Sequence, residues 1–149
     1  MKTWLCILST LVLSSVFADP ISANQGVAVS HDDIPQFSMH GNFQKGVATK
    51  SMGAKQFEVW RSSIAVGSRT PLHVHETEEV FVILKGHILA IVGGQEVHCI
   101  APATLICPSN VPHQLINAGD EPTDQILVVG IDSKISTADG EVMTLPWRK

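Results

Sequence analysis

Short apolar runs that end near glycine or proline restrict the fold of this chain more than any other feature. The runs cover residues 57–60, 64–66, 80–84, 88–92, 97–100, 104–107, 114–116 and 125–131. No stretch longer than ten residues repeats with the 3.6-residue period of an amphipathic helix. Many short strands between frequent turn residues are typical of β-sandwiches and β-barrels. We therefore predict an all-β fold.

The composition fits one packed domain and excludes two classes of partner. The 149 residues lie within the usual range for a single domain, and 44% of them are hydrophobic. The net charge is −4 and no basic cluster exists, so we expect no nucleic-acid partner. Beyond residue 20 no apolar stretch reaches the ~20 residues that a transmembrane helix needs, so we expect no membrane span there.

The N-terminus has the pattern of a cleaved secretory signal peptide. Lys2 supplies the positive start, residues 4–16 form an apolar core, and Ala18 fits the cleavage position. We assign residues 1–18 to the signal, with a retained anchor helix as the alternative. We expect transit through the endoplasmic reticulum and secretion, because the chain ends in Trp-Arg-Lys and not in a retrieval sequence.

Two cysteines remain once the signal is removed. Cys99 and Cys107 flank a segment that we interpret as a hairpin, and an oxidising compartment would permit a disulfide between them. Two free thiols buried in strands are the alternative, since free cysteine is among the most buried residue types. The sequence leaves both interpretations open.

The rest of the chain divides into three segments. We assign an N-terminal arm to residues 19–36, a β-barrel to residues 37–131 and a C-terminal tail to residues 132–149. Within the barrel, the runs 80–84 and 126–129 are apolar without alternation. Such strands are covered on both faces, by a second sheet or by a partner subunit. We therefore expect a homodimer.

Three histidines and one glutamate form the most informative group of polar residues. His73 and His75 are two apart and share one face of a strand, Glu79 follows after a turn, and His113 lies on a later strand. Imidazole and carboxylate ligands together suit Zn, Mn, Fe, Co or Ni. Because imidazole binds a metal only when it is neutral, such a site should lose its ion on acidification. A His-x-His pair on the protein surface is the alternative.

The remaining titratable residues carry less information. Glu78 is a candidate general base, although we expect it to be a solvated neighbour of the predicted ligands. Four further histidines have no comparable set of partner residues nearby in the sequence, and we interpret them as ordinary histidines: His31, His40, His87 and His98. We expect His98 to lie on the outward face of a strand.

The spacing of the predicted ligands resembles the first motif of the cupin superfamily. Every defining position of that motif is filled, by Gly67, His73, His75, Glu79 and Gly86. The resemblance implies a single-domain cupin β-barrel, which is a jelly roll or double-stranded β-helix.

The second cupin motif is matched with two departures. Pro108, His113 and Asn117 stand at the motif spacing. Pro102 and Asn110, however, replace glycines of the motif. Asparagine tolerates the left-handed conformation of a glycine, whereas proline does not, so the turn at Pro102 should differ locally.

Within the superfamily the chain resembles plant auxin-binding proteins, densely over residues 57–60, 67–75 and 78–86 and more loosely at 112–114 and 125–131. The resemblance implies one divalent metal ion per chain, with zinc as the first choice and manganese or iron as alternatives. The implied metal ligands are His73, His75, Glu79 and His113. A small aromatic acid would place its carboxylate on the metal and its ring in a pocket formed by Trp60, Thr70, Pro71, Phe81 and Trp147. The chain lacks the family's retrieval sequence, glycosylation acceptor and cysteine pair, and its tail is shorter.

Three functional hypotheses follow. The first is a secreted protein that binds a small carboxylic acid, such as auxin, at its metal. The alternative from another class is a metal-dependent cupin enzyme: a dioxygenase, an isomerase or an enzyme that degrades oxalate or another organic acid. A third is a structural or storage protein that uses the metal only to hold the fold together. The scarcity of acid–base groups near the predicted ligands favours binding.

Overall fold

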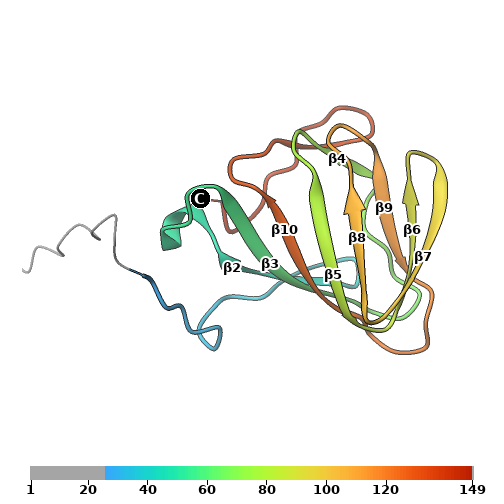
Figure 1. The fold of residues 1–149 in the computed structure, drawn as a ribbon, viewed down its shortest axis with the longest axis horizontal. Coiled ribbons are helices and arrows are strands. Elements are labelled where there is room, and N and C mark those ends of the chain that lie inside the picture. The colour runs from blue at the N-terminus through green and yellow to red at the C-terminus, as the bar shows by residue number, and fades with distance from the viewer. Residues whose placement is uncertain (1–25, 149) are drawn as a thin grey trace, which may run out of the picture.

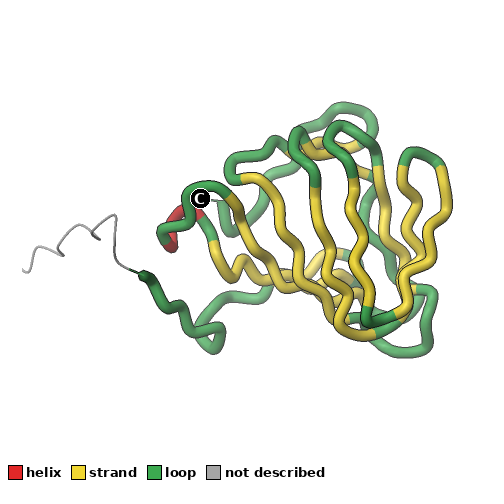
Figure 2. Tube along the Cα trace, viewed as in Figure 1, coloured by secondary structure: helices red, strands yellow, loops and turns green. Residues whose placement is uncertain are grey.

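The computed structural model describes residues 26–148, so the predicted signal peptide and the first part of the predicted arm lie outside the described residues. Strands dominate this part of the chain (Figure 2), and η1 (Lys50–Met52) is its one short helical turn. The strands are β1 (Phe37–Met39), β2 (Asn42–Ala48), β3 (Phe57–Ile64), β4 (His73–His75), β5 (Glu79–Lys85), β6 (His87–Val92), β7 (Gln95–Ile100), β8 (Ala103–Cys107), β9 (His113–Asn117), β10 (Asp124–Gly130) and β11 (Ile135–Thr137). The predicted all-β fold is confirmed.

The strands form two antiparallel sheets that face each other as a barrel (Figure 1). One sheet has six strands in the order β1-β2-β3-β10-β5-β8, and the other has five in the order β11-β4-β9-β6-β7. From β3 onward the chain passes repeatedly from one sheet to the other, with β6 and β7 as the one hairpin within a sheet along this path. This winding is that of a jelly roll, so the predicted single-domain barrel is confirmed.

Alternating burial explains why these segments form strands around one core. In β10, Gln125, Leu127 and Val129 are buried while their neighbours are only partly buried. Each apolar side chain that leaves water in this way contributes roughly 1.5–3 kcal/mol. The buried apolar core consists of Trp60, Ile64, Phe81, Ile83, Ile88, Ala90, Cys99, Leu105, Cys107, Leu115, Leu127, Val129 and Ile135.

The outer face of the six-stranded sheet is apolar as well. Phe57 of β3 and Ile106 of β8 are each 58% exposed, and Val82 and Leu84 of β5 are also exposed. The second sheet therefore covers the inner face of the run 80–84, as predicted. The outer face of this run is open in the single chain.

Two local predictions are wrong. Residues 64–66 are not a separate strand, because Ile64 ends β3 and the chain then turns at Gly67, whose φ is +71°. The segment between Cys99 and Cys107 is not a hairpin, because β7 and β8 belong to different sheets. Both cysteines are buried and free, so the second of the two alternatives for these thiols is the observed one.

The turns that depart from the cupin motif behave as their residue types dictate. Asn110 has a φ of +60°, which confirms the left-handed conformation expected of an asparagine in place of glycine. The Ala101–Pro102 peptide is cis. Within residues 26–148, no helix is long and apolar enough to cross a membrane.

Candidate metal centre

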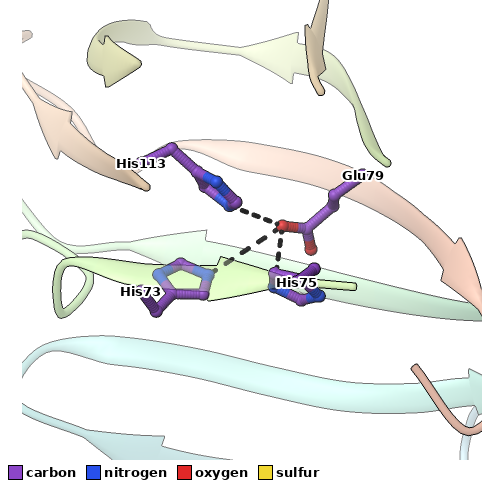
Figure 3. Close-up of side chains that lie close together, drawn as sticks. All are labelled: His73, His75, Glu79 and His113. Carbon is purple, nitrogen blue, oxygen red and sulfur yellow. Dashed lines mark hydrogen bonds and ion pairs between the residues drawn. The ribbon is translucent and has the colours of Figure 1, made fainter. Parts of the chain in front are cut away.

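The four predicted metal ligands come from three strands and both sheets. His73 and His75 are the first and last residues of β4, and His113 is the first residue of the neighbouring β9. Glu79 is the first residue of β5, which belongs to the other sheet. Residues two apart on a strand share a face, so both β4 imidazoles point into the barrel toward the carboxylate (Figure 3).

The ligand atoms of these residues converge on one point. Glu79 Oε2 lies 3.0 Å from His113 Nε2, 3.2 Å from His75 Nε2 and 3.9 Å from His73 Nε2. One nitrogen or oxygen from each of the four residues lies within 4.8 Å of all the others. Such separations suit donors that share a cation at bond lengths of about 2.0–2.2 Å. The structure therefore brings together all four residues that the sequence singled out.

Backbone carbonyls fix the orientation of two of the rings. His73 Nδ1 lies 2.8 Å from the carbonyl oxygen of Pro71, and His113 Nδ1 lies 3.0 Å from that of Val111. A carbonyl only accepts, so Nδ1 must carry a proton in each ring, and in the neutral form of the ring Nε2 then faces the cluster with its lone pair. This is the tautomer that a metal-binding histidine requires.

Burial and mutual charge keep the cluster in its metal-binding protonation state. Burial lowers the pKa of His75 to about 4, against the partly opposing attraction of Glu79. Burial likewise lowers the pKa of His73. Burial alone would raise the pKa of Glu79, but His113 and the other nearby histidines outweigh it, so this pKa lies below its usual value. Neutral imidazoles beside an ionised carboxylate are the forms that bind divalent cations.

Unpaired buried atoms show that the residues fit a metal ion. Both ring nitrogens of His75 and Oε1 of Glu79 are buried without a hydrogen-bond partner, since the 3.2 Å contact between His75 and Glu79 is not aligned as a hydrogen bond. A buried polar atom without a partner is costly. A cation among the four residues would satisfy one nitrogen of His75 and the Glu79 carboxylate, so the cluster is able to hold a metal ion.

A cavity of about 440 Å³ opens beside the cluster. His73, His75 and Glu79 line it at one end, and the five residues that were predicted to bind the ligand also line it: Trp60, Thr70, Pro71, Phe81 and Trp147. The Trp60 and Trp147 rings meet edge to face with centroids 5.1 Å apart. The predicted ligand-binding residues thus share one cavity with the cluster.

Comparison with known proteins agrees with this geometry. Residues 60–129 match the family described as "Cupin domain", and they contain all four residues of the cluster. The chain belongs to the cupin superfamily. Auxin-binding protein T85 of Nicotiana tabacum is 41% identical to this cupin over 87 residues, which are 52% of this chain and 46% of that protein. Auxin-binding protein 1 of Arabidopsis thaliana is 41% identical over 86 residues, 52% of this chain and 43% of that protein. The cupin therefore spans less than half the length of these relatives.

Solved structures share the fold at low sequence identity. The polyketide cyclase RemF of Streptomyces resistomycificus has a TM-score of 0.66 at 16% identity, over 76% of this chain and 86% of that one. A predicted oxalate decarboxylase of Thermotoga maritima has a TM-score of 0.62 at 21% identity, over 70% of this chain and 98% of that one. At these identities the likeness establishes the barrel and leaves the activity open.

Sequence reasoning missed how the C-terminal segment of this cupin is held. Arg148 Nε donates to Glu58 Oε2 at 2.8 Å, and Trp60 Nε1 donates to the same oxygen at 3.2 Å. The Arg148 guanidinium also lies over the Trp60 ring, 5.5 Å from its centroid. Trp147 fits against Gly46, where a Cβ would come within 2.9 Å of the indole ring. Glu58 and Arg148 are 90 residues apart, so no local spacing could have signalled their contact.

Other titratable residues lie outside the cavity. Glu78 is exposed and does not line it, in agreement with the expected solvated position. His98 is exposed on β7, as predicted. The structure also brings His87 Nε2 within 3.0 Å of His98 Nδ1, a two-residue contact that is not part of a metal-binding group among the described residues. Sequence reasoning missed this contact because it crosses from β6 to β7.

Proposed function

We propose that this cupin binds a small aromatic carboxylic acid, such as auxin, at a divalent metal ion, and that the ion is zinc. His73, His75, Glu79 and His113 would hold the ion. The observation that carries the proposal is the position of this cluster at one end of a cavity whose walls are aromatic and apolar. The likeness to auxin-binding proteins supports the choice of ligand.

The charges along the cavity favour this class of ligand. A bound divalent ion supplies a positive centre for a carboxylate. Trp60, Phe81 and Trp147 offer flat apolar surface to a ring. No lysine or arginine lines the cavity within the described residues. Phosphate groups are usually bound by such side chains, so the cavity is better suited to a monocarboxylate than to a phosphorylated molecule.

The cavity also has few groups for acid–base catalysis. Glu79 is its one acidic lining residue among residues 26–148, and Glu79 is already committed to the cluster. General acid–base catalysis uses a titratable side chain within hydrogen-bond reach of the reacting group. This scarcity supports binding over turnover.

Metal analysis and calorimetry test the proposal together. The protein should contain one zinc per chain and bind indole-3-acetate with a submillimolar Kd. His113→Ala should lose the metal and the binding while circular dichroism shows an intact barrel. His40→Ala, an exposed histidine outside the cluster, serves as the control and should change neither property.

Two results would overturn the proposal. Full metal content in His113→Ala would show that the ligand set is wrong. Iron or manganese in the native protein, together with oxygen consumption or turnover of an organic acid, would establish the enzyme instead.

We further propose a secreted homodimer in which residues 1–18 are removed, residues 19–36 form the arm, residues 37–131 the barrel and residues 132–149 the tail. The signal-like N-terminal sequence supports secretion. The exposed apolar side chains on the outer face of the six-stranded sheet, Phe57, Val82, Leu84 and Ile106, support pairing through that face.

A further inference from the structure

The cavity has a second polar region that lies away from the metal cluster. Asn42 of β2, Ser62 of β3 and Gln125 of β10 line it there. All three side chains are buried, Asn42 being 5% and Gln125 1% exposed. Buried polar groups in proteins nearly always have hydrogen-bond partners. The partners of these three residues therefore indicate what this end of the cavity is built to accept.

Strand register places this region at the opposite end from Glu79. On β10, Val129 pairs with Glu79, Leu127 with Phe81, and Gln125 with Ile83. Gln125 and Ser62 are themselves paired, so both lie at the level of Ile83. Four residues of antiparallel strand span about 13 Å. A ligand with its acid group at the cluster and its ring beside Phe81 would thus direct its far end toward Gln125.

Two of the amide side chains at this end present unpaired acceptors. Asn42 Nδ2 donates to the carbonyl oxygens of Met39 at 3.0 Å and of Arg69 at 2.8 Å, which fixes the amide so that Oδ1 is the free end. Gln125 Nε2 lies 3.4 Å from Ser62 Oγ. Asn42 Oδ1 and Gln125 Oε1 are both buried without a partner. Each is an acceptor and would be satisfied by a donor from a ligand.

We propose that this region is a recognition subsite for a neutral hydrogen-bond donor, a hydroxyl or N–H group, at the end of the ligand opposite to its carboxylate. The inference rests on the proposed function, since it takes the acid group to lie at the cluster. No charged side chain of the described chain lines this end, so neither a second carboxylate nor an ammonium group finds a counter-charge there. The ligand class is an aromatic monocarboxylic acid with one distal donor.

The energetic reason is the asymmetry between making and losing a hydrogen bond. A ligand that fills this end with an apolar group leaves Asn42 Oδ1 and Gln125 Oε1 unpaired. A donor in the same place restores a bond. Sites built to pair with a polar substrate group reject its apolar isostere for this reason.

Two nearly isosteric acids test the subsite in the zinc-loaded protein by calorimetry. We expect 3-(4-hydroxyphenyl)propanoate to bind about tenfold more tightly than 3-(4-methylphenyl)propanoate, a difference of about 1.4 kcal/mol. Gln125→Met keeps the length of the side chain and removes the acceptor, so the preference should fall below about threefold. Gln95→Met makes the same change on exposed β7, away from the cavity, and should retain the full preference.

The outcomes separate this inference from the proposed function. Equal binding of both acids to the wild-type protein, or a full preference in Gln125→Met, overturns the subsite and leaves the proposed function standing. Binding of neither acid, or binding unaffected by His113→Ala, overturns the proposed function itself. Gln125 is the residue to change because its amide makes only the 3.4 Å contact with Ser62, whereas Asn42 holds two backbone carbonyls. Should Gln125→Met fail to fold, the comparison of the two acids in the wild-type protein still decides.

Discussion

The ion pair that holds the C-terminal segment allows one prediction to be worked out from the structure. The Glu58 side chain is 1% exposed, and the partner Arg148 side chain is 18% exposed. Arg148→Met keeps much of the side-chain volume but leaves the carboxylate buried with only the Trp60 N–H as a donor. Removing one partner of a buried pair costs roughly 3–5 kcal/mol, because the remaining charge has lost its compensation.

This loss should appear directly in thermal unfolding. For a domain of this size each kcal/mol lowers Tm by roughly 2–4 °C, so Arg148→Met should unfold about 10 °C below the wild-type protein when followed by circular dichroism. The double variant Glu58→Gln/Arg148→Met leaves no buried charge. It should recover most of the lost stability.

An exposed pair provides the matched control. Arg61 pairs with Asp124, and their side chains are 53% and 29% exposed. Such pairs contribute roughly 0–1 kcal/mol, so Arg61→Met should shift Tm by no more than a few degrees. The reasoning is refuted when Arg148→Met is as mild as Arg61→Met, or when the double variant is no more stable than Arg148→Met alone.

The same substitution has an expected effect on binding. Arg148 follows Trp147, and the Trp147 ring packs against Phe37 and Trp60 at centroid distances of 5.9 and 5.1 Å. Loss of the guanidinium releases this segment from Glu58, so Arg148→Met should weaken the binding of the aromatic acid several-fold. Metal content should stay unchanged, because none of the four cluster residues contacts Arg148 through a hydrogen bond.

Three further predictions concern pH, thiols and assembly. The metal-free protein should lose about 3 kcal/mol of unfolding free energy as the pH falls from 6.5 to 4. The reason is that the pKa of His75 is about 4 in the fold, so this side chain is protonated first in the unfolded chain. A urea midpoint that does not change over this pH range contradicts the prediction. Burial raises the pKa of Cys107 to about 12 and that of Cys99 as well. Both thiols should therefore resist a disulfide reagent at pH 8 until denaturant is added, and rapid modification of the native protein refutes this. Light scattering should show a dimer that Ile106→Lys converts to monomer, and a wild-type protein that is monomeric at micromolar concentration removes the proposed interface.

The barrel and the cluster could be predicted because local sequence encodes them. A strand such as β5 is visible as a short apolar run between turns, and His73, His75 and Glu79 lie within seven residues of one another. The spacing of two histidines on one strand fixes their common direction. Only His113 lies far from the other three residues in the sequence. Pro108 and Asn117, which stand at the spacing of the second cupin motif, identified it.

Other features depend on which strands become neighbours, and local sequence does not encode this. The hairpin expected between Cys99 and Cys107 is absent because the chain changes sheets at residues 101–102, and alternating burial looks the same on either side of such a change. β1 and β2 contain no continuous apolar run, and the pairing of β1 with β2 and of β2 with β3 defines them. The contact between Glu58 and Arg148 likewise exists only once the barrel is closed.

The two ends of the cavity are therefore specified in different ways. The cluster end follows from the spacing of a few residues around β4, so its residues could be predicted from the sequence. The opposite end is lined by Asn42, Ser62 and Gln125 on β2, β3 and β10, and the identity of each residue means little until the register is known. In the proposed function the first end binds the acid group, and the proposed subsite at the second end discriminates among acids. A search for the ligand should accordingly keep the carboxylate constant and vary the group at the far end of the ring.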